Sequence, residues 1–459
     1  MEWMKVIVLN GSPKGDVSVT MQYVAYIQKK FPAHDYTIFN VAQDIRKIEK
    51  DGVVFGRILD TVRSADLVLW AFPLYYLLVS SQYKRFIELI FERNAQQAFA
   101  GKYTASLSTS IHFFDQTAHN YVHAICDDLG MHYCGFYSAE MKDLLKEEER
   151  NRFTRFAQLL IVTVQDKIPI QRENAPLVWP SWSYIPGPPP EPVKTSGKKV
   201  VILTDSDETS TNCVKMTERL MLALSGNAEL VNLHDLDIRG GCLGCCQCGI
   251  DNTCVYTDGY RDFYTKTLQA ADIIIMAGTV HDRYLSSTWK QFFDRSFFKG
   301  HTPGLKGKQI GFVIAGPLQQ LPHLKEALSS WADNGDCRAL FVTDEDGNSE
   351  KLDALLDGTV TRLVNGAETG YIPPHTFYAV GGHKIFRDAI YANLRFPFLA
   401  DYRYYKENGL FDFPRMDLRT RVFGTVLSLF IKIPGFRREV LSGIKSHMIQ
   451  PFERVLQNA

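Results

Sequence analysis

The sequence predicts an α/β protein built from two doubly wound parallel sheets in tandem. Short strand-like runs alternate with helix-like segments over residues 1–166, which is typical of a parallel sheet whose crossovers are helices. A proline-rich stretch over residues 171–197 then interrupts the alternation. After it the alternation starts again, and its segments align with those of the first part. Such a repeat indicates a duplicated α/β unit.

The first domain, residues 1–166, begins with a strand over Lys5–Asn10, "KVIVLN", which runs into a glycine turn. A helical pattern follows from Ser18 to Lys30. Further strands are expected at "YTIFNV", "DLVLWAF", "KYTASLST" and "MHYCGFYS", because β-branched and aromatic residues are enriched in each. The domain therefore contains strands separated by segments long enough for crossover helices.

The second domain, residues 198–365, repeats this order. "KVVILT" (Lys199–Thr204) aligns with "KVIVLN", and "AELVNL" aligns with "YTIFNV" 192 residues earlier. "ADIIIMAGTVHDRYLSSTWKQFFD" aligns without a gap with "ADLVLWAFPLYYLLVSSQYKRFIE", 206 residues earlier. The offset grows by about fourteen residues after the second strand, so the second copy has an insertion there. We expect that loop at the carboxyl edge of the sheet, where open α/β sheets bind ligands.

The two segments outside the repeat have different compositions. The linker over residues 171–197 contains seven prolines and is expected to be semi-rigid, with Trp179 and Trp182 packed on a domain surface. Residues 366–459 form an aromatic-rich extension that we expect to be largely helical. Within it, "RVFGTVLSLFIKIPGF" is an apolar run with basic residues around it: Arg419, Arg421, Arg437 and Arg438. We expect it to pack on the domains or on a second subunit, with interfacial membrane binding as the alternative.

Composition excludes several classes of function. Hydrophobic residues make up 45% and charged residues 22%, as in globular proteins. Lys plus Arg equals Asp plus Glu at 51 each, so no bulk charge attracts nucleic acid. No apolar run reaches the ~18 residues of a transmembrane helix, and no signal peptide is apparent. We therefore expect a cytoplasmic protein, in which clustered cysteines are metal ligands or redox groups.

The loop after the first strand, "NGSPKGDVSVT", is suited to a phosphate group. Glycines permit a tight turn, Ser12, Ser18 and Thr20 supply hydroxyl groups, and Lys14 supplies a cation. The N-terminus of the following helix adds free N–H groups and the positive end of its dipole. The loop lacks the lysine followed by serine or threonine of a nucleotide P-loop.

Two further loops complete this edge of the sheet. Pro73, Leu74, Tyr75 and Tyr76 follow the third strand, and "STSIHFFDQ" follows the fourth. A phosphate site beside an aromatic wall suits a flat, phosphorylated heteroaromatic ligand, and flavin mononucleotide (FMN) fits best.

The motifs "GSPKG…S-x-T", "P-x-Y" and "S-x-x-x-K-x-F-I-E" resemble the NADPH-dependent FMN reductase family, whose fold is flavodoxin-like. The resemblance covers residues 1–166 and 198–365 and implies two flavodoxin-like domains in tandem. It also implies a set of FMN-binding residues: Ser12, Lys14, Ser18, Val19 and Thr20 at the phosphate, Pro73, Leu74, Tyr75 and Tyr76 beside the isoalloxazine, and Thr109, Ser110 and His112 on its other side. Tyr75, Tyr76 and His112 are candidates for the catalytic acid by position alone.

The second copy departs from this pattern. Its first loop, "TDSDETSTN", carries Asp205, Asp207 and Glu208, which would repel a phosphate dianion. We therefore expect one FMN per chain, in the first domain.

The inserted loop contains Cys242, Cys245, Cys248 and Cys254, with the spacing C-x2-C-x2-C-x5-C. Thiolates at this spacing can wrap one [4Fe–4S] cubane. The segment resembles the compact cysteine motif of iron–sulfur flavoproteins, a branch of the same family, and Asp258 also matches that branch. Cys246 is expected not to be a ligand. A zinc site and a set of reduced thiols or a disulfide remain alternatives.

These features predict an iron–sulfur flavoprotein oxidoreductase. Electrons would pass between a [4Fe–4S] cluster and FMN to reduce a small-molecule acceptor, with NAD(P)H or a ferredoxin as donor. A plain NAD(P)H-dependent FMN or quinone reductase with a structural cysteine loop is the alternative, and a non-catalytic scaffold or redox sensor is a third interpretation. We expect a homodimer, and a pseudo-twofold pairing that brings residues 240–254 against Pro73–Tyr76 and Thr109–Phe113.

Overall fold

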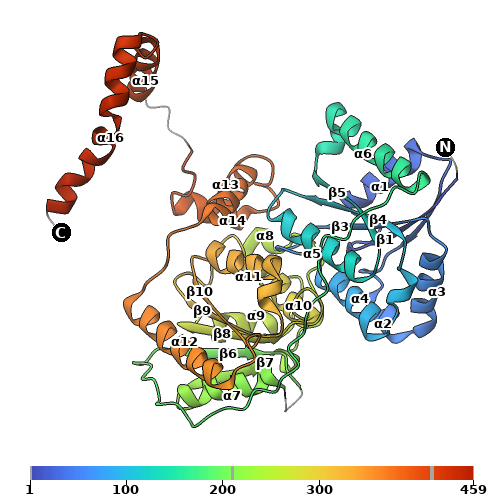
Figure 1. The fold of residues 1–459 in the computed structure, drawn as a ribbon, viewed down its shortest axis with the longest axis horizontal. Coiled ribbons are helices and arrows are strands. Elements are labelled where there is room, and N and C mark those ends of the chain that lie inside the picture. Colours follow the sequence, from blue (N-terminus) through green and yellow to red (C-terminus); the bar gives the residue numbers. More distant parts are fainter. Residues whose placement is uncertain (1–2, 208–210, 414–417, 458–459) are drawn as a thin grey trace. The chain divides into compact units, whose positions relative to one another are not determined.

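The computed structural model describes residues 3–207, 211–413 and 418–457. The chain forms two compact units, Met1–Tyr404 and Tyr405–Ala459. The first unit contains both sheets and the region between them (Figure 1). The second unit is helical and is described by itself below.

The first sheet has five parallel strands in the order β2-β1-β3-β4-β5 (Figure 1). Its strands are β1 (Lys5–Asn10), β2 (Asp35–Phe39), β3 (Leu67–Pro73), β4 (Tyr103–Ser110) and β5 (His132–Glu140). The helices are α1 (Val19–Lys30), α2 (Ile45–Lys50), α3 (Gly52–Arg63), α4 (Ser81–Glu92), α5 (Asp115–Asp128) and α6 (Glu147–Gln165). This strand order is that of flavodoxin-like folds.

The second sheet repeats the first, in the order β7-β6-β8-β9-β10, again with all strands parallel. Its strands are β6 (Val200–Thr204), β7 (Ala228–Asn232), β8 (Ile273–Thr279), β9 (Gln309–Ala315) and β10 (Arg338–Thr343). The helices are α7 (Asn212–Ala223), α8 (Cys248–Asp251), α9 (Tyr260–Phe263), α10 (Ser287–Ser296), α11 (Pro322–Asn334) and α12 (Ser349–Thr369). The tandem of two doubly wound sheets is therefore confirmed.

The central strands are apolar because helices cover both faces of each sheet. In β3, "LVLWAFP", every residue before the final proline is buried, and in β9, "QIGFVIA", every residue is buried. Continuous apolar runs of this kind are the pattern of parallel strands. The edge strands β2 and β7 contain only half-buried and exposed residues, which fits their position.

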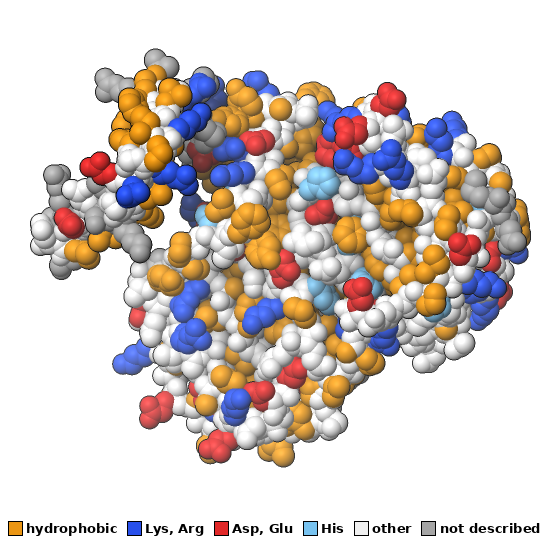
Figure 2. Space-filling model, turned by 45° about the horizontal axis from the view of Figure 1, so that its top comes forward, with side chains coloured by type: hydrophobic (Ala, Val, Ile, Leu, Met, Phe, Trp, Pro, Cys, Tyr) orange, Lys and Arg blue, Asp and Glu red, His pale blue; other side chains and the backbone are white. Residues whose placement is uncertain are grey.

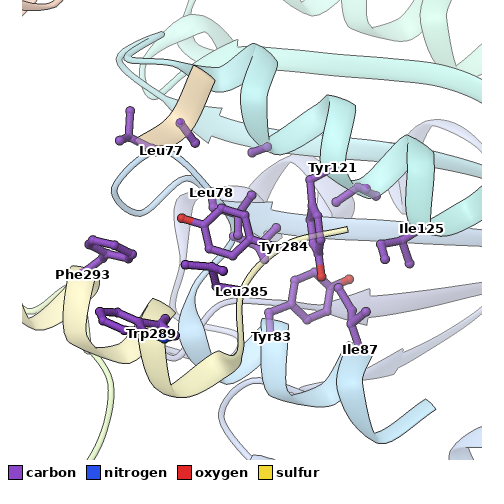
Figure 3. Close-up of a cluster of buried hydrophobic side chains, with 14 of the residues drawn as sticks. Leu77, Leu78, Tyr83, Ile87, Tyr121, Ile125, Tyr284, Leu285, Trp289 and Phe293 are labelled. Atoms are coloured by element: carbon purple, nitrogen blue, oxygen red, sulfur yellow. The ribbon is translucent and has the colours of Figure 1, made fainter. Parts of the chain in front are cut away.

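Helices α4 and α10, which are equivalent in the repeat, pack against each other and join the two domains. Figure 3 shows side chains of both domains in one buried cluster: Leu78, Tyr83, Ile87 and Tyr121 from the first, and Tyr284, Leu285, Trp289 and Phe293 from the second. At the offset of 206 residues, Tyr83 corresponds to Trp289 and Ile87 to Phe293. The contact is therefore nearly self-complementary, like the interface of a twofold dimer.

The linker forms no helix or strand between residues 168 and 199. Its start is hydrogen-bonded to Asp127 and Asp128 of the first domain, and its later part lies on the second domain. The indole N–H of Trp182 donates to the carbonyl of Asp344 at 2.8 Å, and the Tyr184 ring is fully buried. Proline prevents regular structure here, while these aromatic rings fix the path of the chain.

The extension contributes to both units. Helices α13 (Phe377–Tyr391) and α14 (Leu399–Glu407) begin within the first unit, where α13 packs on α11. There His301 Nδ1 lies 2.9 Å from Asp401 Oδ1, and both side chains are buried. In the second unit, α15 (Leu418–Phe430) and α16 (Pro434–Gln457) are joined by a short turn. The expected helical character is confirmed. Among the described residues, none of the helices has the length and apolarity that a membrane span requires.

Candidate functional site

The loop between β1 and α1 forms a tight cradle. The Lys14 N–H donates to Ser12 Oγ at 3.2 Å, and the Gly15 N–H donates to the Ser12 carbonyl at 3.0 Å. Gly15 has a φ of +58°, and a Cβ at Gly11 would overlap the ring of Tyr83. Ser18 caps α1 by accepting the N–H of Met21. The loop thus leads into the N-terminus of α1, with the exposed Lys14 beside it, as an anion site requires.

The loops after β3 and β4 form the apolar side of the site. Tyr76 (φ +30°), Leu77 (φ +67°), His112 (φ +62°) and Phe114 (φ +57°) adopt left-handed backbone conformations. Such conformations cost about 1–3 kcal/mol each and cluster at ligand sites. The hydroxyl of Tyr75 is buried and finds no hydrogen-bond partner among the described residues. Burial raises the pKa of Tyr75, so the phenol stays protonated and can donate.

The cysteine loop of the second domain lies directly against these loops. One cavity of about 390 Å³ is lined from the first domain by Ser12, Lys14, Ser18, Val19, Pro73, Leu74, Tyr75, Tyr76, Thr109 and Ser110, and from the second by Cys242, Cys245, Cys246, Cys248 and Cys254. A Cβ at Gly244, whose φ is +63°, would overlap the Tyr75 hydroxyl. The expected pairing of the cysteine loop with the loops after β3 and β4 is therefore present within one chain.

Two of the residues expected at the FMN do not line this cavity. Thr20 is fully buried, and its hydroxyl lies 2.6 Å from that of Thr109. His112 Nδ1 lies 2.9 Å from Asp115 Oδ2. The hydrogen bond with Asp115 raises the pKa of His112. Ile111 and Phe113 line the cavity in place of His112.

An ion pair that the sequence did not reveal fastens the cysteine loop. Arg295 on α10 makes two contacts of 2.8 Å with the Asp258 carboxylate and donates to the Gly240 carbonyl at 3.0 Å. Asp258 also accepts the N–H of Arg239 at 2.9 Å. Both side chains are buried, and the guanidinium lies 4.4 Å from the ring centroid of Tyr256. The equivalent of Arg295 in the first copy is Leu89, so the first copy cannot form this ion pair.

The thiols face this cavity in an apolar environment. Burial raises the pKa of Cys242 to about 12 and raises that of Cys246 and Cys248. A metal bound here would have to displace protons, as thiolate ligation generally does. Among the described residues, no group of three or more His, Cys, Asp or Glu side chains converges closely enough for a metal ion.

Part of the extension closes the cavity on one side. Phe386, Leu394, Pro397 and Phe398 line it, together with Phe297, which directly follows α10. A Cβ at Gly249 would overlap the Pro397 carbonyl, so the cysteine loop and the extension are in close contact. The sequence motifs predicted no role for this segment in the site, because the segment lies outside the repeat.

The equivalent edge of the second sheet is different. The carboxylate of Asp205 accepts a hydrogen bond from Ser286 and is largely buried, which raises its pKa. Asp207 lies 3.7 Å from His234 Nε2, and Glu208 lies outside the described residues. The larger cavity at this edge, about 1120 Å³, is lined by Asp205 and Asp207 and by Glu49, Glu88 and Glu92 from the first domain. Arg46, Arg85 and Arg239 line the same cavity, so the two aspartates of the loop after β6, and not the charge of the whole cavity, disfavour a phosphate there.

Comparison with known proteins agrees with this architecture. Residues 4–158 match the model of a flavodoxin-like fold family, and residues 198–344 match that of the NADPH-dependent FMN reductase family. An iron–sulfur flavoprotein from Archaeoglobus fulgidus is 28% identical over 141 residues, which are 29% of this chain and 63% of that protein. The match thus spans less than two thirds of the relative's length.

Solved structures with similar folds are more distant. A flavoenzyme NAD(P)H:(acceptor) oxidoreductase from Paracoccus denitrificans is 17% identical, with a TM-score of 0.31, over 36% of this chain and 98% of that one. An FMN-dependent NADH-azoreductase from Bacillus anthracis is 14% identical, with a TM-score of 0.28, over 36% of this chain and all of that one.

Proposed function

We propose that this chain, a tandem of two flavodoxin-like domains whose second domain matches the NADPH-dependent FMN reductase family, is an iron–sulfur flavoprotein oxidoreductase that reduces a small acceptor. One observation carries the proposal: the phosphate cradle of the first domain and the cysteine loop of the second line the same cavity. The phosphate cradle suits the phosphate of FMN, and the clustered thiols suit an iron–sulfur cluster, so the shared cavity suits the two groups side by side.

The residues fit FMN. Ser12, Ser18 and the N-terminus of α1 would hold the phosphate, with Lys14 neutralising part of its charge. The isoalloxazine would lie between the Pro73–Tyr76 loop and the residues after β4. The unpartnered hydroxyl of Tyr75 would donate to the ligands in the cavity. When bound, FMN supplies the interchange between one-electron and two-electron chemistry.

Thiols are the donor type that an iron–sulfur cluster uses, although the described side chains do not converge on one point here. Cys242, Cys245, Cys248 and Cys254 are the ligands that we propose, with Arg295 and Asp258 holding the two ends of the loop. Arg295 lines the same cavity, its Nε is buried and unpartnered among the described residues, and its charge is balanced by Asp258. Aromatic side chains from the extension, Phe386 and Phe398, exclude water from the same cavity.

A second function is supported by one observation. Since no trio of ligands converges among the described residues, a flavin reductase whose cysteine loop carries free thiols also agrees with the geometry. NAD(P)H would then be the donor, whereas a ferredoxin could serve only an enzyme that accepts single electrons.

Assays of iron, acid-labile sulfide and flavin on protein purified without oxygen distinguish these functions. About four irons and one FMN per chain support the iron–sulfur flavoprotein. One FMN without iron or sulfide supports the plain reductase. Protein that contains neither FMN nor iron contradicts both functions.

A further inference from the structure

The two C-terminal helices, α15 and α16, expose most of their large apolar side chains. On α15, Phe423 is 68% exposed and Leu429 is 60% exposed. On α16, Phe452 is 60% exposed and Leu456 is 75% exposed. Figure 2 shows hydrophobic and basic side chains together on these helices. Such a contiguous apolar surface indicates an interaction site.

The apolar side chains follow the helical period. Val422, Val426 and Leu429 are spaced i, i+4 and i+7 on α15, and all three are exposed. Leu441, Ile444, Met448, Phe452 and Val455 continue the same kind of stripe on α16, and all five are exposed. Each helix therefore has one apolar face, as helices at an interface do.

The same segment is strongly basic. Residues 418–457 contain seven basic side chains (Arg419, Arg421, Lys432, Arg437, Arg438, Lys445, Arg454) and two acidic ones (Glu439, Glu453), whereas the whole chain is neutral. Arg421 lies near the start of the exposed apolar run of α15, and Lys432, Arg437 and Arg438 follow its end. Long basic side chains in these positions can place their charge at a polar headgroup while the neighbouring rings enter an apolar layer.

We propose that α15 and α16 bind the surface of an anionic lipid membrane. The helices would lie in the plane of the interface, with their apolar faces inserted to the depth of the headgroup–acyl boundary. At 13 residues, α15 is roughly 20 Å long, shorter than the ~30 Å hydrocarbon core, so it lies on the bilayer. Each basic side chain near an anionic surface adds about 1 kcal/mol to binding, and the excess of basic over acidic residues matches such a surface.

Vesicle flotation with the full-length holoprotein tests this proposal. We expect binding to vesicles of phosphatidylcholine with about 30% phosphatidylglycerol and little binding to phosphatidylcholine alone. Raising the salt to about 0.5 M should weaken it, because the Debye length then falls to a few ångströms. Arg437→Glu with Arg438→Glu should weaken binding at least ~tenfold.

Two further variants make the test specific. Lys47→Glu with Lys50→Glu, a matched pair of exposed residues on α2, should leave binding unchanged. Phe423→Ser with Leu429→Ser should also abolish binding if the apolar faces insert. Retention of binding in that variant would overturn insertion.

Light scattering measures the oligomeric state and so tests whether a second copy of the chain, rather than a membrane, covers these helices. If the wild-type protein fails to bind anionic vesicles, and Phe423→Ser with Leu429→Ser converts a dimer to a monomer, a second copy covers these helices and the proposal is wrong. Unchanged FMN content and thermal unfolding of every variant exclude loss of the fold as the cause, whatever the outcome for the proposed redox function.

Discussion

Glu88 on α4 accepts the backbone N–H of Ser287, the first residue of α10, at 2.6 Å across the junction between the two domains. The reverse contact is also present, since Asp294 on α10 accepts the N–H of Ser81, the first residue of α4, at 2.7 Å. Each helix N-terminus is therefore capped by a carboxylate from the other domain. The sequence offset of 206 relates the two contacts, which indicates that they descend from one contact of a twofold dimer.

The first prediction concerns this junction. Glu88 is buried and lies 2.8 Å from the Lys84 ammonium, which also contacts Asp282 at 2.9 Å. Glu88→Gln should lower the free energy of unfolding by about 3 kcal/mol, because a buried cation loses one partner. Urea denaturation measures this change. Glu92→Gln on the same helix, where the carboxylate is half-exposed, should cost less than about 0.5 kcal/mol, and equal losses in both variants would contradict the prediction.

The second prediction is a pH dependence. Burial alone would raise the pKa of Glu88, but the Lys84 ammonium and hydrogen bonds from Lys84 and Ser287 outweigh it and lower the pKa to about 2. The ionised group therefore stabilises the fold above its ordinary pKa of 4.5, and this contribution is lost as the pH falls toward 2. The difference in unfolding free energy between wild type and Glu88→Gln should be largest near neutral pH and shrink in acid. A difference that stays constant from neutral pH to pH ~3 would show that Glu88 is not ionised in the way proposed.

The third prediction is that one FMN binds per chain, at the first domain. Ser12→Ala with Lys14→Ala should weaken FMN binding at least ~tenfold, because a charge-assisted contact and part of the cradle are lost. Titration of the apoprotein with FMN, followed by flavin fluorescence, gives both affinity and stoichiometry. Ser206→Ala, at the equivalent position of the second copy, serves as the control and should have no effect; two flavins per chain would rule out the assignment.

The fourth prediction concerns the cysteine ligands. Replacing Cys242, Cys245, Cys248 or Cys254 by Ser should remove iron, because a serine hydroxyl is a poor ligand for a cluster held by thiolates. Cys246→Ser is the control within the same loop and should keep its iron. Iron and sulfide analysis of anaerobic protein measures the result, and equal loss in the Cys246 variant would indicate another ligand set.

The fifth prediction tests Arg295 as a positioning residue. Arg295→Lys keeps the charge but cannot make both contacts with Asp258 together with the contact to Gly240. We expect faster alkylation of the partly buried Cys242 in the apoprotein, at least ~fivefold, since the loop is held less firmly, with unchanged FMN affinity. Arg261→Lys, an exposed arginine on the neighbouring α9, should alkylate at the wild-type rate. Unchanged alkylation in Arg295→Lys would mean that the ion pair does not hold the loop.

Much of the fold was predictable because parallel strands leave a strong pattern. The strand β1 covers the predicted Lys5–Asn10, and the other predicted strands match to within about three residues. The insertion carrying the cysteines was predictable from the change of offset, and it lies between β7 and β8. The sequence did not predict that Thr20 and His112 lie outside the cavity lining, because contacts with Thr109 and Asp115 decide the direction of their polar groups.

The sequence by itself determined the repeat, the positions of the predicted strands and the residue types at the carboxyl edges, since these follow from local periodicity and from the connection rules of α/β folds. The tertiary structure alone decided which charges pair across the junction, that Arg295 holds Asp258, and that Phe386 and Phe398 close the cavity. These contacts join segments up to several hundred residues apart and depend on side-chain shape and direction. No local pattern records them, so they emerge only when the two domains and the extension pack together.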